Sequence, residues 1–205
     1  FVDREDILDT FEGLIKELFR SVKGVDFTDP FPRMGYAEAM ERYGCDKPDT
    51  RFGMLINDIT ADVKGNGFAV FDSALCVEGC ASYTRKQLDE LTAFVKRPQV
   101  GAGGMVYIRM DEQGPKSSVD KFYSQDDLAR IAGRCGARTG DLILILSGAK
   151  KKMLPALCAL RLEMGDRLGL RNPDVYSPLW VVDFPLLEWD DETARFYAMH
   201  HPLTS

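Results

Sequence analysis

Residues 141–170 read DLILILSGAKKKMLPALCALRLEMGDRLGL. The five consecutive apolar residues 142–146 predict a strand in the centre of a sheet. From about Lys151 to Arg167, apolar residues recur three or four positions apart, which predicts a helix with one apolar face. Pro155 would lie in the first turn of this helix, where a missing N–H is tolerated. A buried strand followed by a long helix predicts a core in which helices pack on a sheet.

The region from Ile56 to Gly169 alternates short strands and helices, and we expect it to form a domain of its own. Thr84 and Ser124 are each predicted to cap the start of a helix. Further strand patterns lie at 68–71, at 103–110 (GGMVYIRM) and at 118–122 (SVDKF). We therefore expect the α+β class, with a mainly antiparallel sheet covered by helices on one face.

Two other segments flank this region. Residues 3–19 predict a helix with one apolar stripe and one charged face. The segment 31–40 (FPRMGYAEAM) predicts an extended stretch and then a short helix that Gly44 can end, whereas 179–185 (LWVVDFP) predicts a strand. Because no start methionine precedes Phe1 and no closing helix follows the strand-like FYAM, we expect a piece of a longer polypeptide.

Composition excludes several classes of protein. The 205 residues include 26 basic and 32 acidic side chains, for a net charge of −6, and 45% are hydrophobic, which is typical of a globular protein. The sequence contains neither a stretch of about 20 uncharged apolar residues nor a signal-peptide pattern. We expect a cytoplasmic protein with no membrane partner. The acidic balance argues against nucleic-acid binding over the whole surface but leaves a local basic patch open.

The cysteines predict reduced thiols and no metal site. Their number, five, is odd, which argues against a framework of disulfides. Cys76 and Cys80 have the spacing of half a zinc site, but no second pair follows, and the only histidines are His200 and His201.

Three groups of polar residues are candidates for binding. His200 and His201 would point to opposite faces of a strand, so that one could face a site; the alternative is a packed or solvated pair. The run Lys150–Lys152, at a predicted helix N-terminus, could bind phosphate, or could simply be a solvated basic end. The segment 42–51 (RYGCDKPDTR) could border an anion site or form solvated salt bridges. The sequence has no glycine-rich phosphate loop of a known pattern.

Residues 31–51 (FPRMGYAEAMERYGCDKPDTR) resemble, nearly letter for letter, a segment of bacterial-type aspartyl-tRNA synthetases. Other stretches agree in the same order: ASYTRKQLDE (81–90), DLILILSGAKKK (141–152), ALRLEMGDRLGL (159–170), PLWVVDFPLLEWDD (178–191) and AMHHPLTS (198–205).

The resemblance implies a division into domains. In that family an antiparallel class II catalytic domain is interrupted by an α+β insertion, the GAD domain, which is shared with a class of tRNA-dependent amidotransferases. The flanks, residues 1–51 and 177–205, would then belong to the catalytic domain, and residues 52–176 to a GAD-like insertion. We therefore expect the first helix to pack against the last strands.

The resemblance also implies an activity. The parent enzyme would activate aspartate with ATP and Mg, transfer it to tRNA(Asp), and act as a homodimer. The family's Phe-Arg-Asp-Glu motif would precede Phe1 and its ATP-binding arginine would follow Ser205, so we expect this fragment to be inactive and to hold no cofactor. The alternative, from a different class, is a non-catalytic GAD module that binds tRNA or a protein partner.

The same resemblance implies roles for individual residues. AMHHPLTS matches the family's loop that closes over the bound amino acid, so His200, and after it His201, would contact aspartate. Leu203 replaces a more usual Phe, and Gly35 stands where a Thr N-cap is usual. Charge alone suggests the residues for contact with the tRNA acceptor arm: Arg85, Lys86, Lys150, Lys151 and Lys152.

Overall fold

A computed structural model describes residues 1–63, 73–147, 150–190 and 193–199. The predicted strand at 68–71 therefore lies outside the described residues. The helices are α1 (Arg4–Lys23), α2 (Tyr36–Tyr43), α3 (Thr60–Val63), α4 (Arg85–Val95), α5 (Gln125–Arg134) and α6 (Lys150–Arg167). The strands are β1 (Arg33–Gly35), β2 (Ile56–Asp58), β3 (Ser73–Val77), β4 (Gly104–Asp111), β5 (Gly114–Ser117), β6 (Leu142–Ser147), β7 (Trp180–Val182), β8 (Leu187–Asp190) and β9 (Arg195–Ala198).

A five-stranded sheet forms the centre of the molecule. Its order is β2-β3-β6-β4-β5, and every neighbouring pair is antiparallel. The strand β6 is the middle one, as its apolar sequence predicts. The α+β class and the antiparallel sheet are confirmed.

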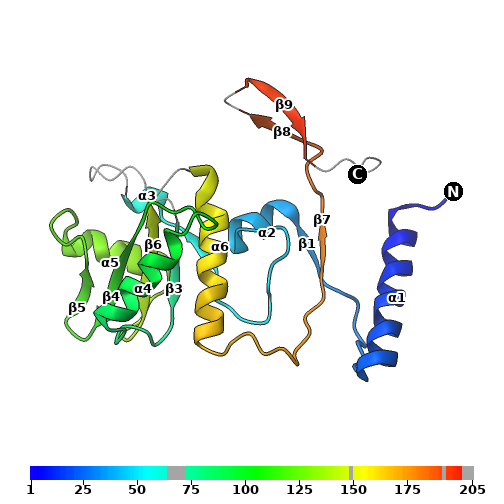
Figure 1. Ribbon diagram of the computed structural model, residues 1–205, viewed down its shortest axis with the longest axis horizontal. Helices are drawn as coiled ribbons and strands as arrows, with labels where there is room; N and C mark the ends of the chain where they lie inside the picture. Colours follow the sequence, from blue (N-terminus) through cyan, green and yellow to red (C-terminus); the bar gives the residue numbers. More distant parts are fainter. Residues whose placement is uncertain (64–72, 148–149, 191–192, 200–205) are drawn as a thin grey trace.

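Helices cover both faces of this sheet, so the expectation of one covered face is wrong. On one face, Leu142, Leu144 and Leu146 of β6 pack with α4 and α6. On the other, Ile143 and Ile145 pack with α3 and α5. In Figure 1, α5 and α6 lie on opposite sides of the strands. Because alternate residues of β6 point to opposite faces and all of them are apolar, each face needs its own layer of helix.

The expected strand at 118–122 is also wrong. These residues form turns after β5, which ends at Ser117. The Asp120 carboxylate accepts a hydrogen bond from the Ser117 N–H at 2.6 Å, and the Ser117 hydroxyl accepts one from the Val119 N–H at 3.2 Å. Short polar side chains that bond to nearby backbone compete with strand pairing, and here they close a turn.

The helix ends follow the predicted caps. Thr84 caps α4 and Ser124 caps α5, each in a capping box with the third helical residue. Asp3 caps α1 in the same way. Gly44 follows α2 in the left-handed conformation, with φ of 75°, which a residue with a side chain would resist.

The first helix contacts β7, which confirms the expected contact with the last strands for that strand. The strands β1 and β7 pair in parallel. The Glu12 carboxylate of α1 accepts hydrogen bonds from the Trp180 indole N–H at 3.2 Å and from the Phe31 N–H at 3.1 Å, and it pairs with Lys16 at 2.9 Å. The Lys16 hydrogen bond is the main reason that the pKa of Glu12 is lowered. Figure 1 shows α1 beside the β1 and β7 segment, remote from the sheet.

Residues Thr50 and Ser177 bring the two ends of the middle region together. Their hydroxyl oxygens are 2.7 Å apart. All buried residues of the two hydrophobic clusters lie between Ile56 and Met164. The core of the sheet is therefore built from one continuous segment whose ends meet.

An ion-pair network joins the segment 42–51 to the end of α6. The Asp49 carboxylate accepts two hydrogen bonds from the Arg51 guanidinium, at 2.9 and 2.7 Å, and one from Arg171 at 3.2 Å. The Arg51 guanidinium also donates to the Asn172 carbonyl at 2.7 Å. The hydrogen bonds from Arg51 are the main reason that the pKa of Asp49 is lowered to about 2. These contacts favour the structural interpretation of the segment.

Arg161 of α6 holds the chain where it enters the sheet. Its side chain is 1% exposed, and its guanidinium donates to the carbonyl oxygens of Phe52, Gly53 and Met54 at 2.7–2.9 Å. The guanidinium also lies 3.9 Å from the Phe52 ring centroid and 4.9 Å from that of Tyr43. Burial lowers the pKa of Arg161, and the carbonyl and aromatic contacts replace part of the lost hydration.

Within the described residues, no helix is both long enough and apolar enough to span a membrane.

Replacing Asp49 with Asn should lower the free energy of unfolding near neutral pH by about 1 kcal/mol, because two arginines lose a charged acceptor. The pKa of Asp49 in the folded chain, about 2, lies below that of an ordinary carboxyl group. Its contribution is therefore complete above about pH 4 and is lost as the pH falls through about 2. In urea unfolding followed by circular dichroism, the midpoint of the Asp49→Asn variant should lie below that of the unchanged chain near neutral pH. The two midpoints should converge as the pH falls.

The matched control is Asp183→Asn. Asp183 pairs with Arg4 at 3.1 Å, but the two side chains are 67% and 55% exposed, so the change should stay within about 0.5 kcal/mol at every pH. If the difference in unfolding midpoint between Asp49→Asn and the unchanged chain stayed constant as the pH fell, the assigned role of Asp49 would be contradicted.

Candidate functional site

The predicted aspartate contacts, His200 and His201, lie outside the described residues, but the segment that leads to them is described. It is the hairpin of β8 and β9, in which Leu187 pairs with Ala198. Met199, the residue before His200, donates its N–H to the Leu186 carbonyl at 3.0 Å. The backbone is therefore held in place directly before the predicted contacts.

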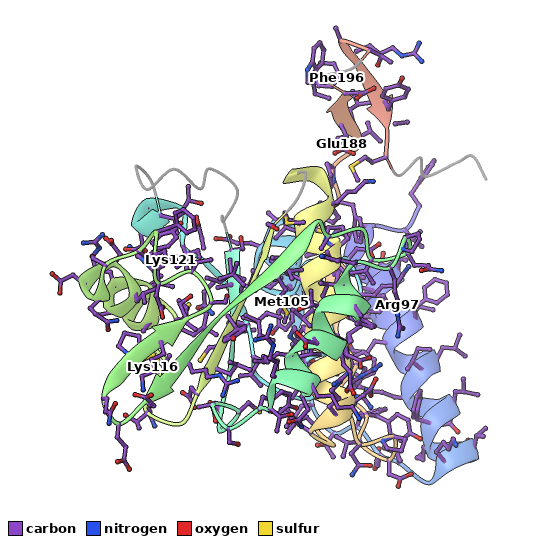
Figure 2. All side chains as sticks on the ribbon, turned by 60° about the vertical axis from the view of Figure 1, so that its left-hand side comes forward. Arg97, Met105, Lys116, Lys121, Glu188 and Phe196 are labelled. Carbon is purple, nitrogen blue, oxygen red and sulfur yellow. The ribbon has the colours of Figure 1, made fainter. Side chains whose placement is uncertain are left out.

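The hairpin extends away from the sheet. Figure 2 shows Glu188 and Phe196 on its two strands, with Glu188 nearer to the body of the molecule. The rings of Trp189 and Phe196 meet edge to face, with centroids 5.1 Å apart. This pair stabilises the hairpin across its two strands.

A cavity of about 570 Å³ separates the base of the hairpin from two helices. The hairpin contributes the carboxyl-bearing residues Glu188 and Asp190, and α6 contributes Leu154 and Pro155. The other lining residues are Met40, Trp189 and Tyr197. The cavity thus has the carboxyl-bearing residues Glu188 and Asp190 on one side and the first turns of α6 on the other, and most of its lining is apolar or aromatic.

Tyr36, the first residue of α2, lies close to Glu188 of the hairpin. Burial, and then the nearby carboxylates of Glu188 and Asp46, raise the pKa of Tyr36. Its ring contacts Phe184, with centroids 5.0 Å apart. No sequence pattern marks Tyr36 or Glu188 as site residues, because only the pairing of β1 with β7 brings the start of α2 near the hairpin.

The structure separates the predicted tRNA-contact residues into two groups. Arg85 and Lys86 begin α4, whereas Lys150, Lys151 and Lys152 begin α6. The side chains of Lys150 and Lys151 lie outside the described part, while those of Arg85, Lys86 and Lys152 are exposed.

The two helices run in opposite directions, which sets these groups apart. A Cβ atom on Gly101, just beyond the end of α4, would lie 3.4 Å from the Lys152 side chain. At the other end of α6, the Arg167 guanidinium lies 3.8 Å from Glu90 of α4. From Lys152 to Arg167 the helix rises by roughly 22 Å. The three lysines at the start of α6 and the pair Arg85 and Lys86 at the start of α4 therefore belong to two separate places in the fold, named here the two basic surfaces.

Comparison with known proteins places the whole chain in one family. The family model for class II tRNA synthetases (D, K and N) matches residues 1–205. The chain is 58% identical to an aspartate–tRNA ligase of Porphyromonas gingivalis and 57% identical to one of Parabacteroides distasonis, and both alignments cover all of it. An aspartate–tRNA ligase of Flavobacterium psychrophilum is 52% identical over the same extent.

The chain spans 36% of the length of these curated relatives. The match to the family model nevertheless extends over every residue, including both flanks and the middle region. The chain therefore belongs to the class II tRNA synthetases of the D, K and N group.

Proposed function

We propose that the chain is a segment of an aspartate–tRNA ligase, whose parent enzyme activates aspartate with ATP and transfers it to tRNA(Asp). The observation that carries this proposal is the match over all 205 residues to relatives named aspartate–tRNA ligase, at up to 58% identity. We further propose that the parent is a cytoplasmic homodimer and that this segment alone does not aminoacylate tRNA.

The domain division belongs to the same proposal. Residues 1–51 and 177–205 would be catalytic-domain flanks, and residues 52–176 a GAD-like insertion. The 2.7 Å approach of the Thr50 and Ser177 hydroxyls supports this division, because an insertion must leave and re-enter its host at neighbouring points. The pairing of β1 with β7 supports it as well. A free-standing GAD module would not contain these paired flanks.

The described residues do not fit a magnesium site. They include no group of three or more His, Cys, Asp or Glu side chains arranged to hold a metal ion. We therefore assign ATP and Mg to the parent enzyme as a whole.

For the substrate aspartate, we propose contacts from His200 and, after it, His201. The hydrogen bond from Met199 to Leu186 supports this assignment, because it anchors the chain one residue before the pair. A histidine placed there can donate a hydrogen bond to a carboxylate, and its protonation changes near neutral pH. A segment with a fixed base can also close over a small ligand.

In the parent enzyme, His200→Ala should raise the KM for aspartate by about 10- to 100-fold in ATP–pyrophosphate exchange, because losing a hydrogen bond to a charged group costs about 1.5–3 kcal/mol. His201→Ala should have a smaller effect. The KM for ATP should change little in either variant.

Lys121→Ala is the matched control, because Lys121 is exposed and lies on the α5 side of the sheet, away from the hairpin (Figure 2). It should leave both KM values unchanged. The proposed role of the histidines would be wrong if neither histidine variant changed the KM for aspartate.

For tRNA, we propose that the two basic surfaces contact phosphates independently. Their separation by most of the length of α6 supports two contacts rather than one, because nearby phosphates on one strand could not reach both surfaces at once. The Arg85 charge is highly exposed: its side chain is 93% exposed, and it pairs with an Asp89 carboxylate oxygen at 3.9 Å.

Charge-reversal variants test the two surfaces one at a time. In the parent enzyme, Lys150, Lys151 and Lys152 are changed to Glu in one variant, and Arg85 and Lys86 in another. Each variant should bind tRNA(Asp) more weakly and should lose about 1 unit of salt-dependence slope for each phosphate contact removed. Filter binding at a series of salt concentrations measures both quantities.

Lys121→Glu serves as the control for a change in net charge alone. If both multiple variants bound tRNA(Asp) as tightly as the unchanged enzyme, the two surfaces would not be tRNA contacts.

A further inference from the structure

Two cysteines from distant parts of the sequence meet where α2 packs on α6. Cys45 follows Gly44, the residue that ends α2, and Cys158 lies in the middle of α6. The chain at Gly44 lies directly on α6: a Cβ atom there would collide with the Leu154 carbonyl and would lie 3.0 Å from the Ile56 side chain. Cys158 is one helical turn after Leu154, and its thiol is within hydrogen-bonding reach of the Cys45 thiol.

The two thiols differ in exposure and in protonation. A hydrogen bond from the Cys158 thiol is the main cause that lowers the pKa of Cys45 to about 6, and the Lys47 N–H and the Arg161 guanidinium also lower it. Donation of this hydrogen bond, together with burial, raises the pKa of Cys158. Cys45 is partly exposed, whereas Cys158 is buried. Cys45 therefore has the properties of an attacking thiolate, and Cys158 those of a second thiol held beside it.

The other three cysteines lack this arrangement. Burial raises the pKa of Cys76 to about 11 and that of Cys135 to about 12, and it also raises the pKa of Cys80. Thiols of this kind react slowly at neutral pH. They provide an internal reference for the reactivity of Cys45.

We propose that Cys45 and Cys158 are a thiol–disulfide pair that a low-molecular-weight disulfide such as glutathione disulfide oxidises to a cystine joining the end of α2 to α6. The Cys45 thiolate attacks one sulfur of the small disulfide, so that a mixed disulfide forms and one small thiolate leaves. This thiolate takes up the proton of the Cys158 thiol. The resulting Cys158 thiolate attacks the Cys45 sulfur and expels the second small thiol as its thiolate, which takes up the proton that Cys45 released on ionising.

Two protein thiols are oxidised to one disulfide, and one small disulfide is reduced to two small thiols. A small dithiol reverses the reaction by the same route. The bond would join elements that the sequence analysis assigns to the first flank and to the middle domain. Oxidation would thus prevent α2 and α6 from moving apart.

The test uses the 205-residue chain and glutathione disulfide. Samples are quenched with acid, alkylated and digested without reduction, and the peptides are identified by mass spectrometry. We expect a peptide that contains the Cys45–Cys158 bond, while Cys76, Cys80 and Cys135 remain alkylated. Because the Cys45 thiol is partly exposed and its pKa is lowered, whereas burial raises the pKa of Cys135, Cys45 should be modified at least about tenfold faster than Cys135 at pH 7.

Variants separate the two steps. Cys158→Ser should stop at a stable glutathione adduct on Cys45, Cys45→Ser should lose the fast reaction, and Cys135→Ser should behave like the unchanged chain. Since the site of Cys158 is buried, Cys158→Ala is a second variant in case Ser unfolds the chain. A persistent glutathione adduct on Cys45 of the unchanged chain, or equal rates at Cys45 and Cys135, would overturn the proposal.

Discussion

The buried guanidinium of Arg161 fixes the path of the chain between the first flank and the sheet. Its three donated hydrogen bonds end on consecutive carbonyls, those of Phe52, Gly53 and Met54. A buried charge costs several kcal/mol unless polar groups replace its water, so these residues have to cross α6 at this place. Met54 adopts a positive φ of 60° there, a strain of about 1 kcal/mol or more that the hydrogen bonds offset. The entry into β2, and with it the edge of the sheet, is set by this contact.

The return path is fixed just beyond the C-terminal end of α6. Asp49 binds both Arg51 and Arg171, so the residues before the sheet and those after α6 are held by one carboxylate. Further along the chain, the Ser177 hydroxyl contacts the Thr50 hydroxyl. The strand β7 that follows then pairs with β1 of the first flank. Two consequences follow: the middle region leaves and returns at one point, and the flanks meet without any contribution from its core.

Local sequence signals predicted much of this fold, because caps and apolar periodicity act over only a few residues. The caps at Thr84 and Ser124 and the central position of β6 are examples. The second helical layer was missed even though residues 142–146 are apolar at every position, a pattern that places apolar side chains on both faces of a strand. Arg161 was overlooked because a charged residue on an apolar stripe looks like an edge position until its carbonyl partners are known. The cavity beside the hairpin involves Met40, Leu154 and Glu188, which only the tertiary fold brings together.

The central claim is that residues 52–176 form a self-contained domain between two flanks that belong together. Both hydrophobic clusters and all three carbonyl partners of Arg161 lie within this range. The most direct measurement is urea unfolding of residues 52–176 alone, followed by far-ultraviolet circular dichroism. The account predicts one cooperative transition with a slope of about 1–3 kcal/mol per molar urea. A gradual loss of signal without a folded baseline would contradict it.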